Sequence, residues 1–496
     1  MSKSVRATYA HPLADEYARP GGPWDIPSLD ELLSAHDANS DADAVANLAG
    51  GLRDRGVEPG SVVCWQAPND ASVALAYRAC WRLGAIAAPI HHALGPDETA
   101  ALVARLKPTV QLAWNDVPLR ALGDTLGPDD VATRGGRADD RWSDPTVLAA
   151  VLFTSGSSGA PKGVLHTQRS LGYKAVLMAE VHGLSTEDVV LMPAPLAHIS
   201  GLLNGITLPG VVPFKSVPMA RWDPELALDL IERERVSFMI GPPTFFVSLM
   251  SAPGFSAERV ASLRLVSSGG AGVTEAFVED AGERLGCVVK RTYGSTEAPT
   301  IATSGVGDDR RAAGTHDGRA LGAVQLRVSD PEAGDERAPG DTGELWVQGP
   351  ELFSGYLDAA ETADAVSDGW FRTGDLATVD AGGWLRIVGR IKDVIIRGGE
   401  NIATAEIEAV LERHPDVAHA VAVGYPDPLM GERVCAFVVS PRGFDLEGCR
   451  AWFAAQGVAK FKTPEQVVAL DALPVLATGK PDRTHLRGLA ASRFGD

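Results

Sequence analysis

The sequence predicts an α/β protein with a large N-terminal domain of parallel-type sheets and helices and a smaller α+β domain at its C-terminal end. Three observations favour this fold class. The chain has 496 residues, which allows two to four domains and a large buried core. Apolar runs end in turns rich in glycine, serine or proline, and helix-like stretches lie between them. A new pattern of short strands around one helix begins near Arg390.

Four apolar runs are each followed by a turn of small residues. Continuous apolar runs are typical of strands buried on both faces, as in parallel sheets covered by helices. The runs and their turns are 147–153 before 154–159, 236–240 before 241–244, 263–266 before 267–272, and 287–290 before 293–297. Helix-like stretches at 225–233 and 275–285 alternate with them, which favours α/β architecture. Because ligands bind beyond the carboxyl ends of such strands, these turns are candidate binding loops.

The C-terminal unit has the pattern of a small α+β domain, for which about 100 residues are enough. Strands are expected at 394–396, 418–424 and 434–439, with a helix over 404–414. Thr404 is expected to cap this helix, and acidic residues follow in its first turn. The expected buried face of the helix consists of Ile407, Val410 and Leu411.

The composition excludes several classes of protein. Lysine and arginine total 45 and aspartate and glutamate total 64, so the net charge of -19 argues against a general nucleic-acid binder. Apolar residues at 45% and charged residues at 22% exclude wholesale disorder. No apolar run reaches the roughly 18 residues of a membrane span, and residues 1–20 lack the apolar core of a signal peptide. The five cysteines are widely spaced, which favours reduced thiols in the cytoplasm over a zinc site or a disulfide framework.

The strongest single motif reads Thr-Ser-Gly-Ser-Ser-Gly-Ala-Pro-Lys-Gly at 154–163. Glycine lets the backbone approach an anion closely, and successive N–H groups and hydroxyls can surround phosphate oxygens. Lys162 would add a point charge. The order differs from the P-loop pattern, because Gly163 stands where that pattern has serine or threonine. A bare run of glycine and serine is also typical of a flexible turn, but its place after a buried strand favours a phosphate loop.

The segment 152–164 resembles the phosphate loop of the adenylate-forming enzymes, the ANL superfamily of acyl-CoA synthetases, adenylation domains and luciferases. Blocks similar to further motifs of that family follow in the same order at 195–201, 268–271, 293–297, 369–375, 389–393 with 399–402, and 474–480. The chain thus looks like an acyl-CoA synthetase, an AMP-dependent acid–CoA ligase. The resemblance implies an adenylation domain over 1–391 that binds ATP and the acid, and a mobile lid domain over 392–496 that carries the catalytic lysine.

The resemblance implies a nucleotide site built from several of these blocks. Tyr293 would stack on adenine, while Asp375, with Arg390 as its partner, would bind the ribose hydroxyls. Taken alone, each block is also typical of an ordinary turn. The residues implied to bind ATP or AMP are Thr154, Ser155, Gly156, Ser157, Ser158, Gly159, Lys162, Gly270, Ala271, Tyr293, Gly294, Asp375 and Arg390.

The resemblance also implies three catalytic residues, Lys480, Thr296 and Glu297. Glu297 would be a Mg²⁺ ligand, since a hard oxygen donor suits this ion, and Thr296 would touch the phosphate. Lys480 would be a mobile cation that neutralises charge near the α-phosphate, an interaction typically worth about 3–4 kcal/mol. Its motif is also similar to one through which some relatives are acetylated, a change that would remove this charge.

Members of this family change conformation between two half-reactions, and the resemblance places the hinge at Lys392. Gly398 and Gly399 would line a channel for the thiol of CoA after the lid domain rotates. Relatives often have proline where this chain has Thr404, so the thiol channel is expected to differ in detail. Without the resemblance, Lys392 would be an ordinary surface lysine.

The resemblance and the residue types together predict an apolar pocket for the acid, and His198 would stand on its substrate side rather than act as an acid or base. No aspartate or glutamate occurs in 195–205, whereas relatives that activate α-amino acids have an aspartate near this point. Aromatic, alicyclic and medium-chain fatty acids all fit such a pocket. Its expected residues are His198, Ile199, Leu202, Gly241, Gly269 and Gly270.

These features predict an ATP-dependent acid–CoA ligase with ATP, Mg²⁺ and CoA as its cofactors and co-substrate. The acid would attack the α-phosphate of ATP to give an acyl adenylate and pyrophosphate, and the thiol of CoA would then displace AMP. Two alternatives stay open: an enzyme that passes the adenylate to a separate carrier protein, an amine or another nucleophile, and one that activates an inorganic oxyanion. A non-catalytic nucleotide-binding regulator is disfavoured, because Lys162, Glu297, Asp375 and Lys480 occur together.

Overall fold

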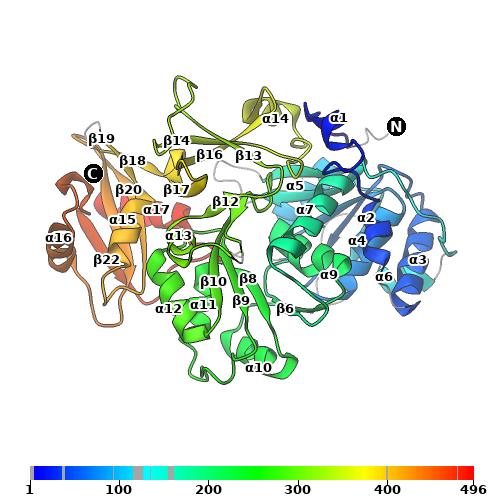
Figure 1. Ribbon diagram of the computed structural model, residues 1–496, viewed down its shortest axis with the longest axis horizontal. Helices are drawn as coiled ribbons and strands as arrows, with labels where there is room; N and C mark the ends of the chain where they lie inside the picture. Colours follow the sequence, from blue (N-terminus) through cyan, green and yellow to red (C-terminus); the bar gives the residue numbers. More distant parts are fainter. Residues whose placement is uncertain are drawn as a thin grey trace.

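The computed structural model describes residues 5–35, 39–92, 94–114, 127–133, 136–154, 161–305, 307–397, 400–476 and 479–495. Figure 1 shows the N-terminal helices at one end of the long axis and the C-terminal strands at the other, with β8–β10 between them. Seven residues with predicted roles lie outside the described residues: Ser155, Gly156, Ser157, Ser158, Gly159, Gly398 and Gly399. In the described part of the chain, no helix is both long and apolar enough to cross a lipid bilayer.

The first sheet has the strand order β3-β1-β2-β4-β5 and is parallel except for the last pair. Every side chain of β1 and β2 is buried, and so is β4 up to its last residue, as its continuous apolar run predicts. Thr154 and Lys162 pair across β4 and β5, so the predicted phosphate loop connects two neighbouring strands. The strands are β1 (Val62–Gln66), β2 (Ile86–Ile90), β3 (Val110–Ala113), β4 (Leu148–Thr154) and β5 (Lys162–Thr167). The helices around them are α3 (Asn39–Arg53), α4 (Ser72–Arg82), α5 (Pro96–Leu106), α6 (Pro128–Thr133) and α7 (Gln168–Val181).

The second sheet has twelve strands, and its first half is parallel. This half runs in the order β7-β6-β8-β9-β10, with helices between its strands. The apolar runs predict β8, β9 and β10, whereas β6 and β7 are not among the predicted strands. The strands are β6 (Val189–Met192), β7 (Lys215–Pro218), β8 (Phe238–Gly241), β9 (Leu265–Gly269) and β10 (Val288–Tyr293). The main helices are α10 (Pro224–Glu234), α11 (Pro243–Met250) and α12 (Glu275–Leu285), and α8 (Ile199–Gly201), a π-helical turn (Leu202–Thr207) and α9 (Leu208–Val211) follow β6.

The other half of this sheet is antiparallel and continues from β10 in the order β11-β12-β17-β16-β14-β13. The prediction of parallel-type sheets therefore describes only part of the domain, because this half is built from antiparallel pairs such as β13–β14. Its strands are β11 (Ala302–Thr303), β12 (Gly318–Ala320), β13 (Gln325–Ser329), β14 (Gly343–Gln348), β15 (Val366–Ser367), β16 (Trp370–Val379) and β17 (Trp384–Arg390). The helices in this part are α13 (Arg310–Thr315) and α14 (Ala359–Ala365).

The third sheet forms the C-terminal α+β unit that the sequence predicts. Its order is β19-β18-β21-β20, with β22 added beside β21. Ile407, Val410 and Leu411 are buried as expected. The expected cap is wrong, because Thr404 is itself the first helical residue and Ala403 stands at the N-cap without a side-chain hydrogen bond. The elements are β18 (Val394–Arg397), β19 (Glu400–Ala403), α15 (Thr404–Leu411), β20 (His419–Asp427), β21 (Gly431–Val439), α16 (Leu446–Ala455), β22 (Gln466–Leu470) and α17 (Arg483–Phe494).

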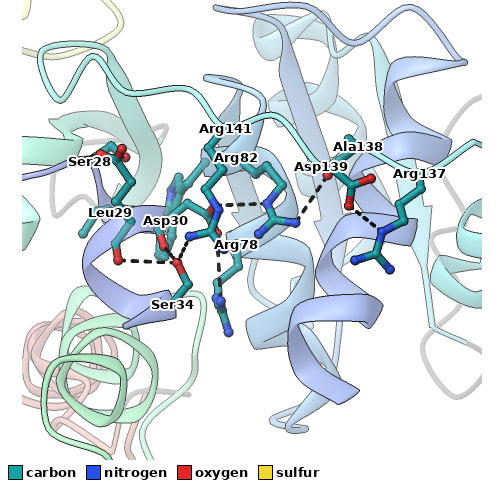
Figure 2. A network of polar contacts seen from close by, with 12 residues as sticks. Ser28, Leu29, Asp30, Ser34, Arg78, Arg82, Arg137, Ala138, Asp139 and Arg141 are labelled. Carbon is teal, nitrogen blue, oxygen red and sulfur yellow. Dashed lines mark hydrogen bonds and ion pairs between the residues drawn. The ribbon is translucent and has the colours of Figure 1, made fainter. Parts of the chain in front are cut away.

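A buried charge network ties the N-terminal segment, with helices α1 (Ala14–Tyr17) and α2 (Leu29–Ser34), to the first sheet. Figure 2 shows Asp30 of α2 surrounded by three arginines. Its carboxylate lies 3.0 Å from Nε of Arg82, 3.6 Å from Nε of Arg141 and 3.9 Å from Nη2 of Arg78. The Asp30 side chain is completely buried, so this carboxylate stabilises the fold only together with its partners.

Candidate active site

A large cleft separates the N-terminal sheets from the C-terminal unit, and most of the described residues with predicted roles line it. The cleft opens beside the ends of β4, β9 and β10, where the sequence places its candidate binding loops. These lining residues come from segments that are far apart in the chain. They are Thr154, Lys162, His198, Gly270, Ala271, Tyr293, Gly294, Thr296, Glu297, Asp375, Arg390, Lys392 and Lys480.

Asp375 is held by two neighbours at one wall of the cleft. It stands opposite Arg390 in the register of β16 and β17, and Nε of Arg390 lies 2.8 Å from its Oδ1. The hydroxyl of Tyr293, at the end of β10, donates a hydrogen bond of 2.6 Å to its Oδ2. Loss of hydration and the nearby Asp375 charge hold the pKa of Tyr293 well above its usual range, so the phenol keeps the proton that it donates. The carboxylate is therefore oriented by both neighbours and buried at the wall of the cleft.

The turn after β10 carries Glu297, and the residue that orients it is Tyr356. The Tyr356 hydroxyl donates a hydrogen bond of 2.7 Å to Oε1 of Glu297. The ammonium of Lys162 lies over the Tyr356 ring, 4.7 Å from its centroid. Such a position is typical of a cation–π contact. One buried tyrosine therefore contacts both the lysine of the predicted phosphate loop and the predicted metal ligand.

The same turn is also anchored from the side of β5 and α7. Nε2 of the buried His166 donates a hydrogen bond of 2.8 Å to the carbonyl of Thr296. The ammonium of Lys174 donates to the carbonyl of Thr300 at 3.0 Å and lies 3.5 Å from the carboxylate of Glu351. Thr300 has a φ of 47°, an uncommon conformation for a residue with a side chain. These contacts fix the backbone of the turn that presents the predicted catalytic residues.

Lys480 reaches the cleft from a tight hairpin of the C-terminal unit. Val475 and Pro481 form a bridge, and the amide of Leu476 donates to the carbonyl of Lys480 at 2.8 Å. The side chain crosses Gly270, which has a φ of 77°, and a Cβ at that glycine would lie 3.2 Å from Cε of the lysine. The glycine thus leaves the space that the lysine occupies.

The electrostatic surroundings of Lys480 place it among the other predicted residues. The walls of the cleft reduce its hydration and the like charge of Arg390 acts in the same direction, so the pKa of Lys480 is lowered from its ordinary value. The carboxylates of Asp375 and Glu297 oppose this shift. A lysine between two carboxylates and an arginine is well placed to receive further negative charge from a ligand.

Lys392 lies in the single 3₁₀ turn, Ile391–Asp393, that leads from β17 into β18. Reduced hydration and the charge of Arg390 lower the pKa of Lys392. The neighbouring Asp393 accepts from Nη2 of Arg487 in α17 at 3.3 Å. The predicted hinge is therefore a short connection between the second and third sheets, with one of its residues bound to the C-terminal helix.

His198 stands at the start of α8 within a group of three histidines. Its ring centroid lies 5.1 Å from that of His91, which is stacked on His92 at 4.7 Å. Burial and the neighbouring charges of His91 and Lys480 lower the pKa of His198 to about 3. The imidazole is therefore neutral near pH 7, and its place on the substrate side of the pocket stays a prediction.

Four residues expected in the acid pocket are not among those that line the cleft. Leu202 is completely buried in the hydrophobic core, and Ile199 packs against the same core. A Cβ at Gly241 would lie 2.8 Å from the ring of Phe245, and one at Gly269 would lie 2.1 Å from the carbonyl of Thr292. The space beside these two glycines is filled by neighbouring protein atoms. Their place in the acid pocket stays a prediction.

The comparisons with known proteins show the family to which the chain is similar. Residues 41–357 match the family described as AMP-binding enzyme, and residues 406–480 match the AMP-binding enzyme C-terminal domain. The medium-chain fatty-acid–CoA ligase of Escherichia coli (strain K12) is 32% identical over 476 residues, which are 90% of this chain and 84% of that protein. The indoleacetate–CoA ligase of Aromatoleum aromaticum (strain DSM 19018 / LMG 30748 / EbN1) is 33% identical over 476 residues, 91% and 92% of the two chains.

Among solved structures, ATP-bound MatB from Rhodopseudomonas palustris has a TM-score of 0.84 and 28% sequence identity, and the match covers 92% of this chain and 93% of that chain. The similarity to MatB therefore extends over the two sheets that position Thr154, Asp375 and Glu297, and also over the C-terminal unit that carries Lys480. With two matching family domains in the same order as the predicted blocks, the chain belongs to the AMP-binding enzymes of the adenylate-forming superfamily and is an acyl-CoA synthetase-like member of it.

Proposed function

We propose that this protein is an ATP-dependent acid–CoA ligase, which activates an aryl, alicyclic or medium-chain carboxylic acid as an acyl adenylate and transfers it to the thiol of CoA. The observation that carries the proposal is the position of Lys480, which crosses Gly270 toward Asp375, Arg390 and Glu297. A cation at this point opposes the negative charge that builds on the α-phosphate in the transition state. The relatives that are named as CoA ligases support CoA as the acceptor.

In this proposal ATP lies in the cleft with its ribose at Asp375 and its phosphates near Thr154 and Lys162. Asp375 is suited to accept hydrogen bonds from two ribose hydroxyls, because Arg390 and Tyr293 already fix its orientation. Tyr293 would stack on adenine beside the backbone of Gly270 and Ala271. Since phosphoryl transfer needs mainly positioning and charge neutralisation, a preorganised site of this kind is sufficient.

Glu297 is the proposed ligand of Mg²⁺. A carboxylate oxygen is the donor that this ion prefers, and the bond from Tyr356 restricts the rotation of the carboxylate. When bound, Mg²⁺ would neutralise part of the phosphate charge. Thr296 is the proposed phosphate contact, and the bond from His166 to its carbonyl keeps its backbone in place.

The proposed reaction has two half-reactions in one cleft. In the first, a carboxylate oxygen of the acid bonds to the α-phosphorus as the bond to pyrophosphate breaks, while Lys480 neutralises the growing charge. In the second, the CoA sulfur, after loss of its proton, bonds to the acyl carbon as the bond to the AMP oxygen breaks. Rotation about Lys392 would remove Lys480 between the two steps and bring Gly398 and Gly399 to the acyl group.

The acid is proposed to lack an ammonium group. The described segment 195–205 contains no carboxylate that would pair with one, and His198 is neutral near pH 7. A separate carrier protein in place of CoA, a cytoplasmic location and a domain boundary between 391 and 392 stay predictions of the sequence.

A panel of aryl, alicyclic and medium-chain acids, each combined with ATP, Mg²⁺ and CoA, an acyl carrier protein or an amine, tests the proposal by mass spectrometry. We expect acid-dependent release of pyrophosphate and an acyl-CoA product. Adenylate formation with transfer only to the carrier or the amine would support the alternative acceptors. Absence of acid-dependent pyrophosphate release across the whole panel would contradict the ligase function.

A further inference from the structure

The hairpin that carries Lys480 rests on the N-terminal end of helix α11. The hydroxyl of Thr244 donates a hydrogen bond of 2.9 Å to the carbonyl of Gly479, the residue directly before the lysine. The two residues are 235 positions apart in the chain, and they connect the second sheet to the C-terminal unit. This bond therefore crosses the interface between the second sheet and the C-terminal unit, which would open in the proposed rotation of the lid domain.

Gly479 fits this position because of both its conformation and its surroundings. Its φ of 80° lies in the left-handed region, which favours glycine. A Cβ at this residue would lie 2.8 Å from Cε1 of Phe245 and 3.3 Å from Cγ of Pro242. The hairpin backbone thus packs directly against the first turn of α11, where the Thr244 hydroxyl meets it.

The surface under the hairpin is itself well supported. The Phe245 ring is buried and stacks on Trp222 with centroids 4.5 Å apart and an interplanar angle of 17°. The indole Nε1 of Trp222 donates to the hydroxyl of Ser248 at 2.8 Å. Because Phe245 stacks on Trp222 and Trp222 is bonded to Ser248 of the same helix, α11 presents the Thr244 hydroxyl at a defined point of the cleft.

We propose that Thr244 is a positioning residue, which holds the Lys480 hairpin over the cleft during adenylate formation. This inference rests on the proposed ligase function. A hydrogen bond to the carbonyl next to Lys480 limits the positions from which the ammonium can approach the α-phosphate. Once the lid domain rotates for transfer to CoA, Lys480 leaves the cleft and the bond is broken. Thr244 therefore acts on the first half-reaction and not on the second.

Substitution Thr244→Val tests this role, because it removes the donor and keeps the shape of the side chain. Loss of one intramolecular hydrogen bond predicts a kcat for acid-dependent ATP–pyrophosphate exchange about threefold to tenfold lower, with the KM for ATP nearly unchanged. Thioester formation from supplied acyl adenylate and CoA should stay at the wild-type rate. Thr244→Ser, which keeps the donor, should restore exchange. As a matched control, Thr146→Val removes a hydroxyl that bonds Asp144 at an exposed turn, and it should change neither half-reaction.

Hydrogen–deuterium exchange of the hairpin gives a readout that does not depend on turnover. In the full chain, the peptide over 474–482 should exchange faster in Thr244→Val and in Gly479→Ala than in the wild type, and peptides of the first sheet should not change. Equal losses in both half-reactions, or unchanged exchange in the hairpin, would overturn the proposal. If the wild type itself releases no pyrophosphate with any acid, the proposed ligase function is contradicted. Hydrogen–deuterium exchange of the peptide over 474–482 then still decides whether Thr244 holds the hairpin in place.

Discussion

The hydroxyl of Tyr356 lies 2.7 Å from Oε1 of Glu297, so a residue outside every predicted block orients the proposed metal ligand. Burial and the Glu297 charge raise the pKa of Tyr356 well above its usual range, so the phenol stays a donor under all ordinary conditions. The ring of the same residue supports the ammonium of Lys162. Tyr356 thus links the two groups that are proposed to meet the phosphates and their metal ion.

Substitution Tyr356→Phe keeps the ring beside Lys162 and removes the bond to Glu297. Without this bond the carboxylate must be ordered by the ion itself, which makes binding of Mg²⁺ weaker. We expect the Mg²⁺ concentration for half-maximal ATP–pyrophosphate exchange to rise about threefold to tenfold, with little change in the KM for the acid. Tyr9→Phe is a suitable control, because it removes a hydroxyl that donates to the carbonyl of Gly369. An unchanged Mg²⁺ dependence in Tyr356→Phe would contradict the orienting role.

Substitution Lys480→Ala should separate the two half-reactions. The lysine is proposed to oppose charge only in the first step, so pyrophosphate release should fall by about 100-fold or more. Capture of supplied acyl adenylate by CoA should continue at nearly the wild-type rate, since the proposed rotation about Lys392 removes Lys480 from the cleft before this step. Rapid-quench measurements of AMP release from the supplied adenylate check the second step. A parallel fall of both rates would mean that Lys480 supports the fold or the cleft as a whole.

The predicted site residues belong to short blocks whose order in the chain is distinctive, and the structure brings thirteen of the described ones to one cleft, while their roles stay predictions. Tyr356, His166 and Thr244 escape such reasoning, because their partners lie 59, 130 and 235 residues away along the chain. A polar residue inside an apolar stretch, such as His166 in β5, is the local signal that was present. It indicates a buried partner and does not identify it.

The same limit applies to the fold. In the parallel half of the second sheet, β8, β9 and β10 are predicted from continuous apolar runs, whereas β16 and β17 mix buried and exposed side chains and contain no such run. Gly241 and Gly269 are a similar case. A glycine in a strand indicates that something approaches the backbone closely, but only the structure identifies it as the Phe245 ring and the Thr292 carbonyl.

His166 makes the stability of the N-terminal domain sensitive to acid. Burial lowers the pKa of His166 to about 4 from 6.5, although its bond to Thr296 acts in the opposite direction. Between these two pH values the unfolded chain binds a proton that the folded chain does not, so stability falls as the pH falls from 6.5 to 4. The full loss of unfolding free energy from protonation of this residue is about 3 kcal/mol.

His166→Gln keeps a donor and does not titrate, so its free energy of unfolding in urea should fall less than that of the wild type between pH 7 and pH 4. Equal falls would contradict the assignment.

Asp30 is expected to be the most sensitive carboxylate of the N-terminal segment. Figure 2 shows it facing arginines from α4 and from the segment before β4, and its side chain is completely buried. Asp30→Asn removes the only charge that the described structure places against Arg82, whose own side chain is 3% exposed. A broken buried pair of this kind typically costs about 3–5 kcal/mol, because one charge stays buried without compensation.

Asp139→Asn is the matched control in the same view, since its pair with Arg137 is largely exposed and screened by solvent. Thermal unfolding should show a clear loss for Asp30→Asn and a curve close to wild type for Asp139→Asn. Similar curves for the two variants would mean that the arginines are neutralised by other groups.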